Sequence, residues 1–229
     1  MVTGSGDSSL FQEVFPKSRF ESFDWYGGCF SNPSQKQSVS GNNANSFQLF
    51  TVGGMKFVAL HLECNAPDNV LEWASSVLRK HADRRAMITT HMGWGPKDKP
   101  KQAEDYFVAP KGRMAWKKCH GANGNTPQQM WDKCFSRHRN VFLICSGDQS
   151  RTQAYRNVAH GEHGNQVHEL LSDYGIYGLR VMRFHPAEDQ IEVRTWNPLK
   201  GQLCEGTKVV PDADQHQFTL TYEMLGEGK

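Results

Sequence analysis

Residues 84–95 have the sequence RRAMITTHMGWG, and the apolar run Ala86–Thr90 within them predicts a buried strand that ends at His91. A second apolar run, Val141–Cys145, predicts another buried strand, which the polar segment Ser146–Ser150 follows. In α/β folds, ligands and catalytic groups usually lie where parallel strands end. We therefore expect His91 to belong to a functional site, and the alternative is a loop histidine without a role.

Strand and helix periodicities surround these two runs. Phe47–Thr51 and Lys56–Glu63 alternate on either side of a Gly-Gly pair and predict a β-hairpin. Pro67–His81 carries apolar residues at helical spacing, and Pro127–Arg137 predicts a second helix. The order strand, helix, strand predicts a parallel crossover. The C-terminal segments expected to form antiparallel strands are Leu179–Phe184, Gln190–Trp196 and Gln217–Tyr222.

The chain has the length of one domain, which we expect to cover residues 1–229. Residues 1–46 are turn-rich and predict an irregular N-terminal arm, ahead of a sheet and helix core over residues 47–225. One short helix is expected in the arm at Ser9–Phe15. The aromatic Trp25–Gly28 run is expected to be a loop that packs on the core.

Charge and composition narrow the function classes. The formal net charge of +2 is too small to indicate binding to nucleic acid or to an anionic membrane. We see neither an apolar run of membrane-spanning length nor a signal peptide, and the cellular location stays unknown. The six cysteines include no Cys-x-x-Cys pair, which argues against a zinc ribbon, and Cys64 and Cys145 are expected to be core thiols.

For two groups of polar residues away from His91, a structural role ranks ahead of metal binding. His61 and Glu63 fall on one face of a predicted strand, where a polar outer face ranks ahead of a metal pair. The histidine-rich segment His160–His168 matches no compact zinc-ligand spacing and is interpreted as scaffold.

The connection over residues 95–125 is long and rich in lysine and arginine. We rank first the interpretation that this connection is a solvated loop. Because connections of this length inside domains are often functional, the second is that it attracts an anionic group, such as a phosphoryl ester, beside His91.

Motifs in the middle of the chain and near its N-terminus resemble those of the calcineurin-like metallophosphoesterase family. The order of His91, a long loop, a helix, a strand and the tip Gly147–Ser150 resembles the family's C-terminal half, in which that tip reads Gly-His-x-His. Near the N-terminus, Val2–Asp7 followed by Phe11–Pro16 and Trp25–Gly28 is similar to the family's Val-Pro-Gly-Asn-His-Asp motif and the aromatic runs after it. The resemblance extends to about residue 222.

The resemblance implies an α/β (α+β) fold, namely a partial metallophosphoesterase-like β-sandwich flanked by helices. It implies that His91 and Asp148 are catalytic and that they bind, with Asp7, a divalent metal such as Zn, Mn or Fe. The basic residues expected to bind an anionic small-molecule substrate are Lys97, Lys99 and Arg151.

The chain departs from the family's pattern at the metal site. It has no Asp-x-His motif and no upstream Gly-Asp motif, Ser5 and Gly6 replace Asn-His, and Asp148 and Ser150 replace two histidines. We therefore expect a truncated hydrolase remnant that acts on phosphate esters or related esters through an atypical or single-metal site. The alternative is a non-catalytic binding or interaction domain that has lost the metal centre.

A truncated sandwich would leave apolar faces and strand edges uncovered. We therefore expect a homodimer in which a second copy covers the missing half of the fold.

Overall fold

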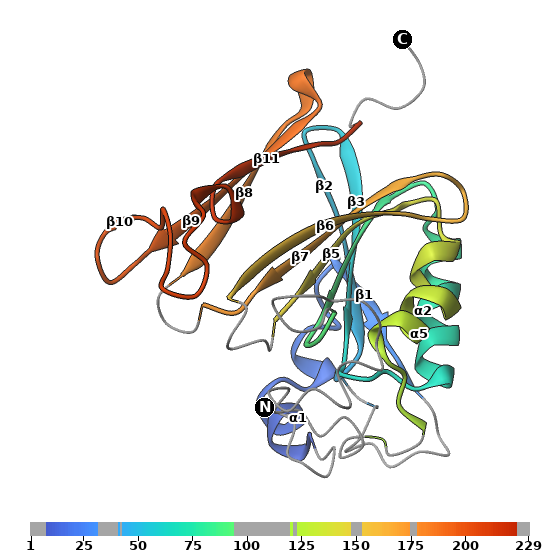
Figure 1. Ribbon diagram of the computed structural model, residues 1–229. Coiled ribbons are helices and arrows are strands. Elements are labelled where there is room, and N and C mark those ends of the chain that lie inside the picture. The colour runs from blue at the N-terminus through green and yellow to red at the C-terminus, as the bar shows by residue number, and fades with distance from the viewer. Residues whose placement is uncertain are drawn as a thin grey trace.

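The computed structural model describes residues 8–31, 41, 43–93, 120, 123–147, 153–174 and 178–223 (Figure 1). Its α-helices are α1 (Ser9–Val14), α2 (Asp68–Lys80) and α5 (Pro127–Lys133). Its strands are β1 (Tyr26–Cys29), β2 (Ser46–Val52), β3 (Met55–Leu62), β4 (Arg85–Thr90), β5 (Val141–Ser146), β6 (Ala154–His160), β7 (Gln166–Ser172), β8 (Leu179–His185), β9 (Gln190–Asn197), β10 (Gln202–Leu203) and β11 (Phe218–Thr221). Short 3₁₀ helices are η1 (Lys17–Arg19), η3 (Phe135–Arg137), η5 (Pro186–Glu188) and η6 (Ala213–Gln215).

The larger sheet has seven strands in the order β1-β2-β3-β4-β5-β7-β6. Its central strands β3, β4, β5 and β7 are parallel, with Leu60 opposite Ile88 and Ile88 opposite Ile144. These four strands therefore end at one edge of the sheet, which we call the carboxyl edge, and begin at the other, the amino edge. The predicted parallel crossover is confirmed, because α2 connects β3 to β4.

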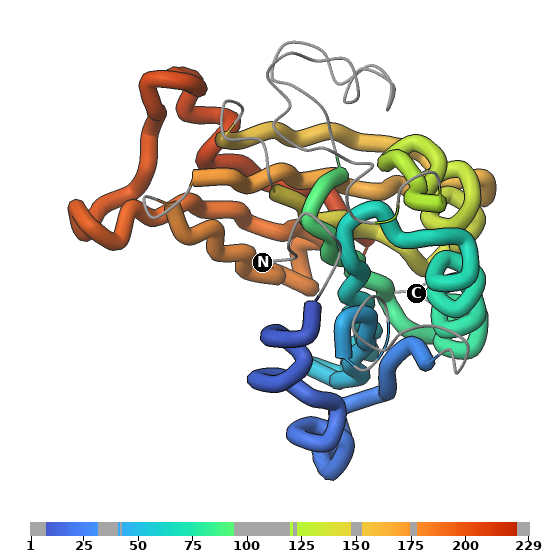
Figure 2. The backbone as a smooth tube through the Cα atoms, turned by 90° about the horizontal axis from the view of Figure 1, so that it is seen from below, coloured from blue at the N-terminus to red at the C-terminus, as the bar shows by residue number. Residues whose placement is uncertain are grey.

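The two longer helices cover one face of this sheet. Pro67 precedes α2, and the apolar stripe that includes Val70, Ala74 and Leu78 is buried against strand residues such as Leu60. Thr126 caps α5 through a reciprocal capping box with Gln129. The helices lie side by side in Figures 1 and 2. The Ser75 hydroxyl of α2 donates to the sulfur of Cys134, the residue directly after α5, at 3.2 Å.

The second sheet has the order β10-β9-β11, with β8 also paired to β9. Its residues Ile191 and Val193 pack against Phe57, Phe142 and Leu143 of the larger sheet in one buried cluster. The layers are therefore helices, larger sheet and smaller sheet (Figure 1). The expected mixed α/β chain with flanking helices is confirmed at this level.

Strands β1 and β6, at the two edges of the larger sheet, were not expected from the sequence. Tyr26–Cys29, inside the segment predicted to be an irregular arm with a loop at Trp25–Gly28, is strand β1 and pairs with β2. A Cβ at Gly27 would lie 2.0 Å from a ring carbon of Phe47, so the glycine allows this close approach. Strand β6 forms the opposite edge of the sheet and pairs with β7 over its whole length. Both are edge strands, whose apolar pattern is weak.

The described cysteines, which are Cys29, Cys64, Cys134, Cys145 and Cys204, are free thiols. Burial raises the pKa of the Cys145 thiol to about 11, so it stays protonated at neutral pH. Cys64 is buried, and both residues are core thiols as expected. Within the described residues, no helix has the length and apolar character needed to cross a membrane.

Candidate functional site at the carboxyl edge

His91 lies at the carboxyl edge, directly after β4, and is exposed. The backbone N–H of Gly147, which follows β5, donates to the carbonyl of His91 at 2.9 Å. The ends of these two strands are therefore joined, and the residue that follows Gly147 in the chain is Asp148. The structure brings together the two strand tips that the sequence singled out.

The segments after β4 and β5 approach each other closely. A Cβ at Gly93 would lie 2.7 Å from Ser146 Oγ, a separation that only glycine avoids. Met92, which lies between His91 and Gly93 in the sequence, is fully buried and anchors the chain next to His91. Ser146 Oγ is also buried and has no hydrogen-bond partner among the described residues. Because buried polar atoms are normally paired, this hydroxyl can hydrogen-bond to a ligand at the edge.

A second such oxygen lies where β6 begins. Gln153 has a left-handed backbone with φ of 56°, and its carbonyl accepts from the Asp173 N–H at 2.8 Å. Its side-chain Oε1 is buried without a hydrogen-bond partner in the described part of the chain. Ser146 and Gln153 therefore flank residues 148–152 and offer two oxygens for hydrogen bonds at this edge.

A buried pair of hydrogen-bonded side chains lies at the same edge, after β3. Glu63 Oε2 lies 2.9 Å from His120 Nε2, and the two side chains are only 7% and 6% exposed. The other carboxylate oxygen accepts from Asn45 Nδ2 at 2.8 Å, while the Glu63 N–H donates to Asn45 Oδ1 at 2.9 Å. Thr90, immediately before His91, donates to the Glu63 carbonyl at 3.2 Å. The pair thus joins the long connection to the sheet edge beside His91.

The interpretation of His61 and Glu63 as a polar outer face is wrong. Strand β3 ends at Leu62, so Glu63 turns inward to His120, while His61 stays in the sheet. His61 Nε2 hydrogen-bonds to Gln48 Oε1, an acceptor, so Nδ1 accepts from the Thr89 hydroxyl at 2.6 Å. Burial lowers the pKa of His61, which agrees with this neutral ring. No sequence spacing indicated the Glu63–His120 pair, whose members are 57 residues apart.

His91 is the predicted site residue that the structure places. The others, Asp7, Lys97, Lys99, Asp148 and Arg151, lie outside the described residues. Within the described part, no group of three or more His, Cys, Asp or Glu side chains could hold a metal ion. His168 is part of the scaffold as expected, because its buried Nε2 donates to the Thr221 carbonyl at 2.8 Å.

Comparison with known proteins gives one distant similarity and no family. No family model matches the chain, and no solved structure matches it. The chain is similar to "Uncharacterized protein YvnB" from Bacillus subtilis (strain 168), with 22% identity over 226 residues that cover 94% of this chain. The chain spans about 15% of the length of that relative.

Proposed function

We propose that the carboxyl edge is the active site of a phosphoester hydrolase of the metallophosphoesterase type, in an atypical form built around His91. The observation that carries the proposal is the 2.9 Å hydrogen bond from the Gly147 N–H to the His91 carbonyl. It sets the exposed His91 beside Gly147, the residue that precedes Asp148 in the sequence. The unpartnered oxygens of Ser146 and Gln153 support a ligand-binding role for this edge.

The layered architecture supports the same proposal. In the partial metallophosphoesterase-like sandwich that we propose, the smaller sheet packs on one face of the larger sheet and α2 and α5 on the other. Sites in such folds lie where parallel strands end, and β4 and β5 end beside each other here.

The residues that would hold a divalent ion are His91, Asp148 and Asp7. Imidazole and carboxylate donors suit Zn, Mn and Fe, so these residue types fit such an ion. When bound, the ion activates a water molecule and polarises phosphoryl oxygens. The chain's own part is to orient the ester through the Ser146 hydroxyl, which can donate to a phosphoryl oxygen, while Gln153 Oε1 can only accept, for example from a water molecule. The basic residues proposed to attract its negative charge are Lys97, Lys99 and Arg151.

The alternative is a binding or interaction domain without catalysis. It is supported by the replacement of family ligands with Ser5, Gly6, Asp148 and Ser150, since serine and glycine are poor substitutes for histidine and asparagine. In that case the carboxyl edge would retain an anionic small molecule but would not hydrolyse it.

Metal content tests the proposed hydrolase. We expect purified wild-type protein to contain near-stoichiometric Zn, Mn or Fe by elemental mass spectrometry, and His91→Ala to lose most of it. We expect the wild type also to hydrolyse chromogenic phosphate monoesters or diesters, and His91→Ala to be inactive. The control is His160→Ala, because His160 is an exposed histidine at the amino edge. Absence of metal from the wild type after supplementation would favour the binding domain.

The association state is a separate prediction, because we propose that the chain forms a homodimer. The N-terminal segment exposes apolar side chains, among which Leu10 is 74% and Phe15 is 40% exposed. We expect light scattering at micromolar concentration to give about twice the 25.9 kDa of one chain. The double variant Leu10→Asp/Phe15→Asp should be monomeric. Leu199→Asp, at a position that is 65% exposed on a turn of the smaller sheet, should remain dimeric. A monodisperse wild-type monomer contradicts the proposal.

A further inference from the structure

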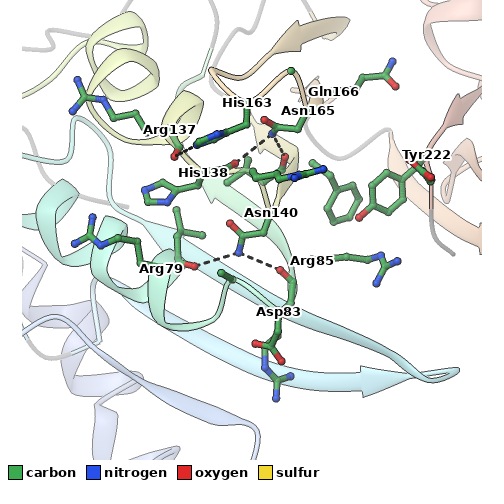
Figure 3. A pocket seen from close by; sticks show the side chains of 18 residues that line it. Arg79, Asp83, Arg85, Arg137, His138, Asn140, His163, Asn165, Gln166 and Tyr222 are labelled. Atoms are coloured by element: carbon green, nitrogen blue, oxygen red, sulfur yellow. Dashed lines mark hydrogen bonds between the residues drawn. The ribbon is translucent and has the colours of Figure 1, made fainter. Parts of the chain in front are cut away.

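A cavity of about 850 Å³ lies at the amino edge of the larger sheet, opposite the candidate active site (Figure 3). It is formed by the end of α2, the segment from η3 into β5, and the turn between β6 and β7. Neither the proposed hydrolysis nor the carboxyl edge involves these residues.

The lining of this cavity concentrates positive charge. Its arginines are Arg79, Arg84, Arg85, Arg137 and Arg139. Its acidic residues are Asp83 and Glu223, and Asp83 is paired with Lys56 at 3.1 Å. Five arginines against two carboxylates leave a surplus of three positive charges, in a chain whose net charge is only +2. Such a cleft attracts anions.

His138 is part of this lining and lies between Arg79 and Arg137 in Figure 3. The residue is only 7% exposed, and its Nε2 is buried without a hydrogen-bond partner among the described residues. Burial first, and then the charges of Arg79, His163 and Arg137, lower the pKa of His138 to about 4, against the opposing effect of Glu162. The ring is therefore neutral at pH 7, and its surroundings are electropositive.

The guanidinium groups of Arg79 and Arg137, which lie next to His138, have N–H groups available for a ligand. Arg79 is exposed, and its guanidinium makes no hydrogen bond or ion pair with any described residue. Arg137 uses Nε, which donates to the Asp132 carbonyl at 2.7 Å and lies 3.8 Å from Glu162 Oε1. Its two terminal nitrogens have no partner within the described part of the chain. Guanidinium groups with free terminal nitrogens suit the oxygens of a phosphate.

The backbone that carries these groups is held in place by two asparagine side chains. Asn140 Nδ2 lies within hydrogen-bonding distance of the carbonyls of Leu78, His81 and Arg84, at 3.3, 3.1 and 3.1 Å, and its two N–H groups are shared among them. Asn140 directly precedes β5, so these contacts tie the end of α2 to that strand. Asn165 Nδ2 donates to the His138 carbonyl at 3.3 Å from the opposite turn. Figure 3 shows both asparagines inside the lining. The cleft is thus organised before any ligand arrives, which reduces the ordering cost of binding.

We propose that this cleft binds a phosphate-class oxyanion, held by the guanidinium groups of Arg79 and Arg137 and by the Nε2–H of His138. The anion satisfies the buried Nε2 and offsets the surplus charge. This site is separate from the carboxyl edge, and its existence does not depend on the proposed hydrolysis.

Titration calorimetry with inorganic phosphate, at constant ionic strength in chloride, tests the proposal on the full chain. We expect saturable binding by the wild type, weakened about tenfold by Arg79→Gln and about tenfold by Arg137→Gln, because each removes charged hydrogen bonds. Arg183→Gln is the matched control, since Arg183 on β8 is 73% exposed and remote from the cleft. In His91→Ala, which removes the proposed site at the carboxyl edge, phosphate binding at the amino-edge cleft should persist and should still be weakened by Arg79→Gln.

Nuclear magnetic resonance of the histidine ring protons shows where on the protein the phosphate binds. Phosphate should shift the His138 signals and raise the pKa of this ring, because an anion counters the charges of Arg79, His163 and Arg137. Lack of phosphate binding overturns the proposal. It is equally overturned if Arg79→Gln binds like the wild type, or if His91→Ala abolishes binding, since the anion would then occupy only the carboxyl edge.

Discussion

Replacing His120 with alanine is expected to lower the free energy of unfolding by about 3 kcal/mol, because the change leaves one oxygen of a buried carboxylate without its hydrogen-bond partner. Glu63 is only 7% exposed on its side chain and has His120 and Asn45 as its hydrogen-bond partners. The Asn45 amide donates only to the other carboxylate oxygen and leaves Glu63 Oε2 without a partner. Chemical denaturation at neutral pH measures the loss.

A double-mutant cycle separates this pair from unrelated effects of the substitutions. In His120→Ala/Glu63→Gln a neutral amide takes the place of the carboxylate and is less costly to bury without the His120 partner, so the double variant should be more stable than the sum of the single changes predicts. The control is again His160→Ala, which removes an exposed histidine and should change the free energy of unfolding by less than about 0.5 kcal/mol. Additive losses in the cycle would show that Glu63 and His120 do not interact.

The stability of the protein should fall by about 2 to 3 kcal/mol through His138 alone as the pH drops from about 6.5 to about 4. Burial and the nearby charges of Arg79, His163 and Arg137 hold the pKa of His138 at about 4, below the value of 6.5 for a free histidine. The unfolded chain therefore binds a proton in this interval that the folded chain does not. The contribution is complete above pH 6.5 and is lost as the pH falls.

Two other histidines, His61 and His168, also make the folded state less stable as the pH falls. Burial lowers the pKa of both His61 and His168, so each also favours the folded state more at neutral than at acidic pH. Denaturant titrations across this pH interval, in phosphate-free buffer, measure the combined slope.

The variant His138→Phe removes one titrating ring while it keeps an aromatic side chain in the buried space. Its stability should depend less steeply on pH than that of the wild type, and His138→Gln provides a second test should phenylalanine perturb the packing. An unchanged slope in both variants would mean that His138 has an ordinary pKa in the folded protein.

Local patterns in the sequence were sufficient for most of the fold. The strand expected at Ala86–Thr90 is Arg85–Thr90, and the helix expected from Pro67 to His81 is Asp68–Lys80. Apolar periodicity identifies such elements because one face of each is buried. The helix expected to reach Arg137 ends at Lys133 and continues only as a 3₁₀ turn, since Cys134 leaves the helical region with φ of −135°.

Apolar periodicity did not predict β1 and β6, the two edge strands of the larger sheet. Gly27 and Gly28 give β1 a low strand propensity, and its place depends on pairing with β2 and on contact with Phe47. For the candidate site, the sequence singled out the tips at His91 and Gly147, and the structure places them 2.9 Å apart through their backbones.

What the sequence by itself determined is therefore the order of the central strands and the two longer helices and the position of His91 after a buried strand. Only the tertiary structure decided that Glu63 meets His120 and that Arg79 and Arg137 meet around His138. Periodicity is a property of neighbouring residues, whereas these contacts join segments that the sheet and the helix crossovers bring together. Their partners are fixed by packing across the whole domain, and no local spacing in the chain records that packing.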